Sequence, residues 1–152
     1  MPARLINAPV GPLLLIEDGG LLAEIRFADG DEPDRDDTPL LKCAQKQLDE
    51  FFAGGRRKFD LPLIPARTAF QQRVRKAMVS IPWGQTLSYG EIAHITGSAP
   101  RAVGQACGAN MLPLVVPCHR VLAANGIGGY SGAKGLDTKR FLLALEKAGP
   151  TG

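Results

Sequence analysis

The chain has 152 residues, of which 45% are hydrophobic and 22% are charged, so it can bury a core as one domain or two small ones. No apolar run approaches the roughly 18 residues that a membrane span needs. Pro9, Pro12, Glu17 and Asp18 interrupt any apolar signal-peptide region. These features exclude an integral membrane protein of the helical type, and we expect an intracellular, cytoplasmic protein.

Charge is divided unevenly along the chain. Residues 1–66 carry eight Lys and Arg against twelve Asp and Glu, whereas residues 67–152 carry ten against three. A basic second half suggests a polyanionic partner, and incidental surface charge is the alternative. We place a domain boundary at this change, giving an N-terminal domain of residues 1–66 and a C-terminal domain of residues 67–152.

The first half reads as a small α/β unit with an antiparallel sheet. Two apolar runs flank Glu17 to Gly20 within residues 11–30, which is a hairpin signal. The acidic stretch 29–38 lacks periodicity and is expected to be a loop. A helix is predicted next, ended by Gly54-Gly55, from apolar residues at helical spacing: Leu40, Leu41, Ala44, Leu48, Phe51 and Phe52. Residues 58–65 are expected to form a third strand ended by Pro65.

The second half is expected to be mainly helical. Capping-box patterns begin at Thr68 and at Ser88, and Pro82 ends the first of the two helices. The second helix runs to about Thr96, Gly97 breaks it, and Pro100 begins another. Two short helices joined by a tight turn form a helix-turn-helix candidate. The last helix begins near Asp137, closes at Gly149-Pro150 and is expected to point three side chains inward: Phe141, Leu142 and Leu145.

The second helix of this candidate, within residues 100–110, has unusual chemistry. Arg101 and Gln105 share one face, and Val103 and Cys107 share another, so Cys107 is expected in the core. Most remaining positions are small, whereas a helix that reads base edges usually carries several long polar side chains. One interpretation is a smooth helix that approaches a narrow surface with Arg101 inserted. The other is a structural helix packed closely through its small residues.

Three cysteines, at positions 43, 107 and 118, give no disulfide framework and no Cys-x-x-Cys pair, which argues against a zinc site. Cys43 is expected to be a structural or surface thiol. Cys118 lies beside His119 after the apolar run 112–117, which is expected to be a buried strand. Consecutive side chains of a strand point to opposite faces, so the two couple only if the chain turns or a water bridges them. A buried structural thiol is the alternative. Glu146, in the last helix, is available to orient the imidazole.

A glycine-rich segment follows, with glycines at positions 126, 128, 129, 132 and 135. It lacks the third glycine and the strand–helix frame of a dinucleotide-binding loop. We interpret it as a pocket wall or lid, with Tyr130 and Ser131 as its polar contacts.

Five segments together resemble the O6-alkylguanine-DNA alkyltransferases, which are direct-reversal DNA repair proteins. They are "IPWGQTLSYGEIA", "PRAVGQACGAN", "PLVVPCHRV", "GGYSG" and "FLLALE", within residues 67–149. The resemblance implies an α+β fold with a ribonuclease H-like N-terminal domain and a helical C-terminal domain. It implies stoichiometric, irreversible transfer of the alkyl group of O6-methylguanine, and of O4-methylthymine, to the protein's own cysteine, with no cofactor and no metal.

The resemblance also implies roles for individual residues. Cys118 matches the alkyl acceptor, His119 the base that acts through a bridging water, and Glu146 the carboxylate that orients His119. Tyr89 matches the tyrosine that supports base flipping and the guanine leaving group, and Asn110 matches a hinge asparagine. The base pocket would include Val121, Tyr130, Ser131 and Lys139. The contacts to DNA would come from Arg101, Ala102, Gln105, Ala106 and Gly108.

The implied partner is double-stranded DNA containing alkylated guanine, bound through the minor groove by a monomer, with cooperative assembly left open. A small-residue helix suits the minor groove, and the reacting O6 substituent is reached only after the base leaves the stack. Some relatives carry a zinc ion or a regulatory domain for which this chain has no matching residues. The alternatives are a helix-turn-helix lesion sensor without chemistry and a cysteine hydrolase, for which a distant His/Asn partner is missing.

Overall fold

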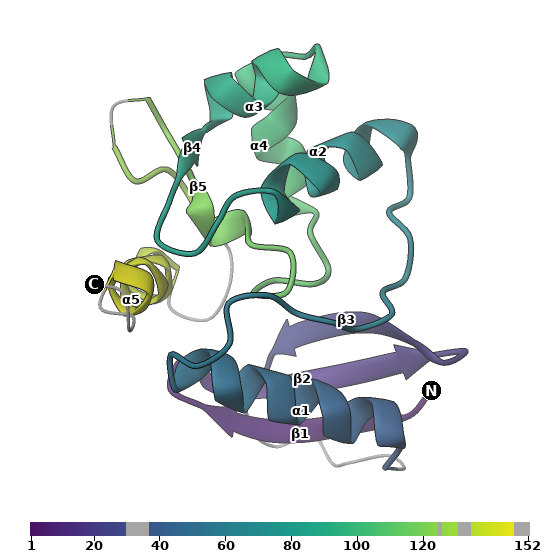
Figure 1. Ribbon diagram of the computed structural model, residues 1–152. Coiled ribbons are helices and arrows are strands. Elements are labelled where there is room, and N and C mark those ends of the chain that lie inside the picture. Colours follow the sequence, from purple (N-terminus) through teal and green to yellow (C-terminus); the bar gives the residue numbers. More distant parts are fainter. Residues whose placement is uncertain (30–36, 125, 131–134, 148–152) are drawn as a thin grey trace.

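The computed structural model describes residues 1–29, 37–124, 126–130 and 135–147. A three-stranded antiparallel sheet opens the chain, in the order β1 (Ala3–Ala8), β2 (Gly11–Asp18) and β3 (Leu21–Phe27). Helix α1 (Pro39–Phe52) crosses one face of this sheet, as Figure 1 shows. Thr38 caps α1 by accepting a hydrogen bond from the backbone N–H of Leu41.

The remaining elements are mostly helical and lie on the other side of a long connection from the sheet (Figure 1). Their bounds are α2 (Ala69–Val79), β4 (Leu87–Ser88), α3 (Tyr89–Thr96), α4 (Pro100–Gly108), a 3₁₀ turn (Cys118–Arg120), β5 (Val121–Leu122) and α5 (Leu136–Lys147). The predicted α+β class, with an antiparallel sheet followed by a helical region, is therefore confirmed. No helix in the described part of the chain is long and apolar enough to cross a membrane.

The helix-turn-helix prediction is confirmed by α3 and α4, which pack against each other and against α2. Ser88 and Glu91 form a complete capping box at the start of α3. Gly97 ends α3 with φ of 69°, a left-handed conformation that glycine adopts without strain. These local signals explain why the motif was readable from sequence.

The third strand of the sheet was predicted in the wrong place. It is β1, at the N-terminus, whereas residues 58–65 form only an isolated bridge between Leu63 and Leu22. Pro62 and Pro65 carry no N–H to donate to a ladder. The segment still covers the edge of β3, because Leu22 donates to the carbonyl of Pro62 and accepts from Ile64.

Two other expectations were wrong. Residues 112–117 are buried but form no strand, since Leu114 takes φ of 76° and an isolated bridge joins Pro113 to Val116. On α5, Phe141 is 40% exposed, and the buried residues are Thr138, Lys139, Leu142 and Glu146. The buried face of α5 is thus largely polar, which an apolar pattern does not reveal.

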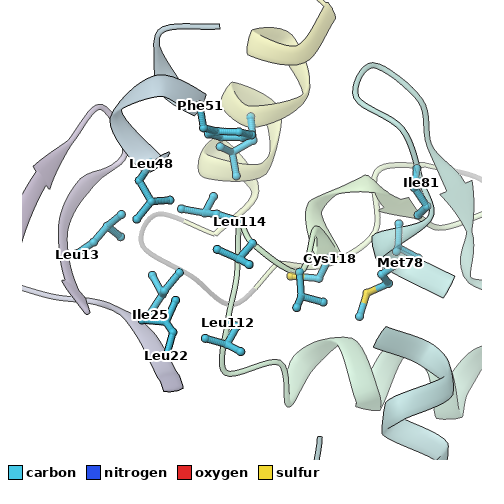
Figure 2. Close-up of a cluster of buried hydrophobic side chains, with 14 of the residues drawn as sticks. Leu13, Leu22, Ile25, Leu48, Phe51, Met78, Ile81, Leu112, Leu114 and Cys118 are labelled. Atoms are coloured by element: carbon cyan, nitrogen blue, oxygen red, sulfur yellow. The ribbon is translucent and has the colours of Figure 1, made fainter. Parts of the chain in front are cut away.

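One hydrophobic cluster draws on both halves of the chain. Figure 2 shows Leu112 and Leu114 between sheet residues such as Leu22 and the region of Met78, with the Cys118 sulfur at that end of the cluster. The segment before Cys118 is therefore packed between the sheet and the helices. Its rigidity fixes where the thiol lies.

Candidate active site

The chain turns at Cys118. Pro117 has φ of −80° and ψ of 67°, and the N–H of Cys118 donates across it to the carbonyl of Val116 at 2.8 Å, which is an inverse γ-turn. A 3₁₀ turn follows, closed by the bond from the N–H of Arg120 to the carbonyl of Pro117 at 3.0 Å. In a strand, the consecutive side chains of Cys118 and His119 would point to opposite faces. Because the chain turns here, that objection to coupling them no longer applies. Both residues are buried, at 9% and 0% exposure.

Glu146 of α5 holds His119 in place. Its Oε2 lies 2.8 Å from Nε2 of His119, and both side chains are at most 1% exposed. Arg120 donates to the same carboxylate from Nε and from Nη2, at 3.0 and 2.7 Å, and its Nη1 donates to the carbonyl of Ile81 at 2.7 Å. A buried carboxylate with these donors is fully engaged. The structure thus brings His119, Arg120 and Glu146 together, and Cys118 directly precedes this cluster in the chain.

Arg120 belongs to this cluster, and the sequence analysis did not include it among the site residues. It was visible in the "PCHR" string, but its partners lie 26 and 39 positions away along the chain. Only the fold brings them together. A buried arginine requires a buried carboxylate, and in this half Glu146 is one of only three acidic residues. That scarcity of acidic residues is the signal from which the pair could have been predicted.

The electrostatics assign a base to the site. Burial would raise the pKa of Glu146, but hydrogen bonds from His119 and Arg120 outweigh it and lower that pKa. Burial lowers the pKa of His119, against the opposing effect of Glu146. A neutral imidazole beside an ionised carboxylate donates from Nε2, which leaves the lone pair on Nδ1. Nδ1 is buried and has no hydrogen-bond partner among the described residues, so it is the basic nitrogen.

The thiol of Cys118 is held protonated at rest. Burial raises its pKa, while a hydrogen bond from the Asn110 side chain and the charge of Lys139 oppose that effect. Asn110 follows α4 and also donates to the carbonyl of Val116 at 2.9 Å, while its Oδ1 accepts from the N–H of Leu112. One side chain therefore ties the end of the helix-turn-helix to the segment that carries the thiol.

Tyr89 and Lys139 lie near Cys118, since the charge of each group and that of the thiol influence each other. The parallel pair β4–β5 sets Leu87 opposite Val121, which brings Tyr89 of α3 beside the turn that bears the thiol. Lys139 is fully buried, and its Nζ donates to the carbonyls of Val121 and Gly129 at 2.7 and 3.0 Å. The same Nζ lies 5.9 Å from the centroid of the Tyr89 ring, and burial lowers the Lys139 pKa.

The pocket residues of the glycine-rich segment are described only in part. Ser131 lies outside the described residues. Tyr130 is half-buried, its ring packs edge-on against Phe27 of β3 at 6.2 Å, and its hydroxyl has no partner among the described residues. Burial raises the Tyr130 pKa. Gly128 takes φ of 78°, and a Cβ there would come within 3.0 Å of the Tyr89 ring.

The two faces of α4 are distinct. Arg101, Gln105 and Gly108 are exposed and follow helical spacing, whereas Val103 is fully buried. Ala102 and Ala106 are half-buried, and Ala106 packs against the core. Cys107 lies on the inner side, 3.7 Å from the sulfur of Met78, as expected, while Cys43 is exposed on α1. This part of α4 carries little side-chain bulk, because Ala102, Ala106 and Gly108 are small, and the space beside Gly108 is open.

Comparison with known proteins identifies the class. The model of the 6-O-methylguanine DNA methyltransferase ribonuclease-like domain matches residues 1–65, and that of the DNA-binding domain of the same family matches residues 69–148. The chain belongs to the 6-O-methylguanine DNA methyltransferase family. The resemblance predicted from the sequence motifs is therefore confirmed.

Individual relatives are similar over nearly the whole chain. The methylated-DNA–protein-cysteine methyltransferase of Mycobacterium tuberculosis is 45% identical over 95% of this chain and 92% of its own length. The protein of that name from Methanosarcina acetivorans is 42% identical, over 93% and 96%. The crystal structure of Mycobacterium tuberculosis OGT in complex with DNA is 43% identical, with a TM-score of 0.85 over 96% of this chain and 92% of that one.

Proposed function

We propose that this protein is a methylated-DNA–protein-cysteine methyltransferase that repairs DNA by direct reversal. It transfers the alkyl group of O6-methylguanine, and of O4-methylthymine, to the sulfur of Cys118. The observation that carries this assignment is the buried contact between Glu146 and His119, the residue that follows Cys118. Asn110, at the end of the helix-turn-helix, hydrogen-bonds to the segment that carries this thiol. A lesion sensor without chemistry would need no such base.

The transfer proceeds in two steps. Nδ1 of His119 takes the proton of the Cys118 thiol through a bridging water, while Glu146 holds the opposite face of the imidazole. The sulfur then attacks the alkyl carbon in line. The S–C bond forms as the C–O bond breaks, and the electron pair goes to O6 of guanine, where Tyr89 supports the leaving group. A thioether has no easy leaving path, so each molecule reacts once and needs no cofactor.

The remaining proposed roles concern the base and the duplex. We propose that Val121, Tyr130, Ser131 and Lys139 form the pocket for the flipped base. The carbonyl of Val121 accepts from Lys139 and keeps a second lone pair for the base. Arg101 fills the gap in the duplex after flipping, and the small residues of α4 let the backbone enter the minor groove.

The DNA surface proposed on α4 consists of Arg101, Ala102, Gln105, Ala106 and Gly108. Residues 67–152 form the DNA-binding domain, and residues 1–66 form a domain that supports it. The protein works as a monomer in the cytoplasm. Phosphate contacts by the basic second half make binding steeply dependent on salt. Titration at several salt concentrations tests this, and a flat response contradicts it.

The test of the chemistry is the fate of the methyl group. After incubation with duplex DNA carrying one O6-methylguanine, we expect mass spectrometry to find one added methyl on the Cys118 peptide. Cys118→Ala should bind the same duplex without acquiring a methyl, and Cys43→Ala, at an exposed thiol, should react like the wild type. A Cys118 peptide of unchanged mass, despite measurable DNA binding, would reject the transferase function in favour of the lesion sensor.

A further inference from the structure

The last residue of the N-terminal sheet contacts the proposed base pocket. Phe27 ends β3, and its ring packs edge-on against Tyr130, with the ring centroids 6.2 Å apart and the planes at 80°. Aromatic rings attract each other in this arrangement. Phe27 lies in the segment matched by the ribonuclease-like domain, and Tyr130 lies in the segment matched by the DNA-binding domain. The contact therefore connects one domain to the pocket of the other.

The backbone on the Phe27 side of this contact is fixed. Phe27 lies opposite Leu13 in the antiparallel ladder of β2 and β3, and the N–H of Ala28 donates to the carbonyl of Pro12 at 3.0 Å. The Phe27 side chain is half-buried and packs against the same hydrophobic cluster that contains Leu13. A side chain held in this way is a rigid support for the ring that it touches.

The ring of Tyr130 is held by packing and not by a hydrogen bond. Its hydroxyl is buried and has no hydrogen-bond partner among the described residues. Within the same part of the chain, Phe27 is the aromatic side chain in ring contact with Tyr130. The backbone before Tyr130 is tied to α5, because the carbonyl of Gly129 accepts from Nζ of Lys139 at 3.0 Å. The orientation of the Tyr130 ring thus depends on its apolar neighbours, and Phe27 is one of them.

Tyr130 also lies near the reacting sulfur. Burial, and after it the charge of Cys118, raise the pKa of the Tyr130 hydroxyl. Cys118 is a member of the hydrophobic cluster against which Tyr130 packs. An alkyl group that approaches the thiol therefore meets the Tyr130 ring as part of its surroundings. A shift of this ring changes the room available for that group.

We propose that Phe27 is a positioning residue for alkyl transfer, which holds the Tyr130 ring and so limits the size of the alkyl group that reaches Cys118. This inference rests on the proposed function. It gives the ribonuclease-like domain a part in choosing the substrate. A smaller side chain at position 27 leaves a space beside Tyr130, and neighbouring groups relax partly into such spaces. The pocket then widens, so a small alkyl group is aligned less well and a bulky one gains room.

The experiment compares two duplexes of the same sequence, which carry one O6-methylguanine or one O6-benzylguanine, in single-turnover transfer to the full chain. We expect Phe27→Leu to slow methyl transfer by roughly tenfold, since misplacing a reacting group by about 1 Å can cost up to about a hundredfold. Benzyl transfer should slow less, so the ratio of the benzyl rate to the methyl rate should rise several-fold. A general loss of stability would slow both reactions alike and leave this ratio unchanged.

Phe52→Leu is the matched control. Phe52 is also half-buried and packs against the same cluster, but its edge-on contact is with Phe51 of α1. This variant should leave the ratio of rates unchanged. Tyr130→Leu removes the ring through which Phe27 acts, so adding Phe27→Leu to it should change the ratio no further.

The outcomes separate this inference from the proposed function. An unchanged ratio in Phe27→Leu, or equal changes in Phe27→Leu and Phe52→Leu, would overturn the positioning role. A full effect of Phe27→Leu in the Tyr130→Leu background would overturn the action through Tyr130. Absence of methyl transfer to the wild-type chain would instead reject the transferase function itself.

Discussion

The two halves of the chain hold their charges in different ways. The ion pairs of the first half, such as Arg26 with Glu24 and Arg56 with Glu50, lie at the surface with both side chains at least 20% exposed. In the second half, His119 and Arg120 share Glu146 with all three side chains at most 6% exposed. Surface pairs contribute about 0–1 kcal/mol each, whereas breaking a buried pair costs several. The halves therefore differ in that the second holds one charged cluster in its interior, besides an exposed pair of its own between Asp137 and Arg140.

The largest expected effect comes from breaking the buried cluster. Glu146→Gln keeps the shape but removes the negative charge that His119 and Arg120 share. We expect it to lower the free energy of unfolding by about 3 to 5 kcal/mol and to slow methyl transfer. Glu50→Gln makes the same change in the exposed pair with Arg56 and should cost at most about 1 kcal/mol. Urea unfolding of both variants measures the difference, and similar losses would contradict the contrast between the halves.

Gly20 in the first half and Gly128 in the second half differ in how closely the protein packs around the backbone. Both have positive φ, 78° and 82°, but a Cβ at Gly20 meets nothing within 4 Å, whereas one at Gly128 meets Tyr89 and the backbone of Ala123. Gly20→Ala should cost about 1 to 2 kcal/mol from conformation alone. Gly128→Ala should cost about 1 to 3 kcal/mol more through overpacking. It should also slow transfer by displacing Tyr89, and equal stabilities would refute the contact.

The sequence predicted what local patterns encode. Ser88 with Glu91, Gly97 and Pro100 defined α3, the turn and α4, because caps and breakers act within a few residues. The motifs likewise predicted Cys118, His119 and Glu146 as site residues, and in the structure Glu146 contacts His119 in the turn that begins at Cys118. Their functional roles stay predictions until the methyl group is followed.

What the sequence did not predict depends on distant contacts. Strand β1 was missed because its partner β2 supplies the hydrogen bonds that define it. The turn before Cys118 depends on the packing of Leu114 between the halves, and Arg120 finds Glu146 only in the fold. Phe141 was misplaced because two charged residues with separate partners, Lys139 and Glu146, occupy the inner face of α5. The spacing of apolar residues does not predict which charged residues are buried.

The buried imidazole predicts a dependence of stability on pH. Burial puts the pKa of His119 below its unfolded value, which is near 6.5. As pH falls below that value, the unfolded chain binds a proton that the folded chain does not, so the free energy of unfolding decreases. The slope for one proton is at most about 1.4 kcal/mol per pH unit. Urea unfolding between about pH 5.5 and 7 should show it, and His119→Asn should flatten it. An unchanged slope in that variant would assign the effect elsewhere.

The smallest effect on stability is expected on the exposed face of α4, where the effect on function should be specific. Arg101→Ala should change the free energy of unfolding by less than about 0.5 kcal/mol, because its side chain is exposed. If Arg101 fills the space of the flipped base, its loss slows transfer from duplex DNA by roughly tenfold, or about 1.4 kcal/mol of barrier, and barely affects transfer from free O6-methylguanine. Arg73→Ala, an exposed cation on α2, is the matched control for charge and should leave the ratio of the two rates unchanged. Equal losses of transfer rate on both substrates for Arg101→Ala would mean that this residue acts near the thiol and not in the duplex. The position of Arg101 on the exposed face of α4 argues against that outcome.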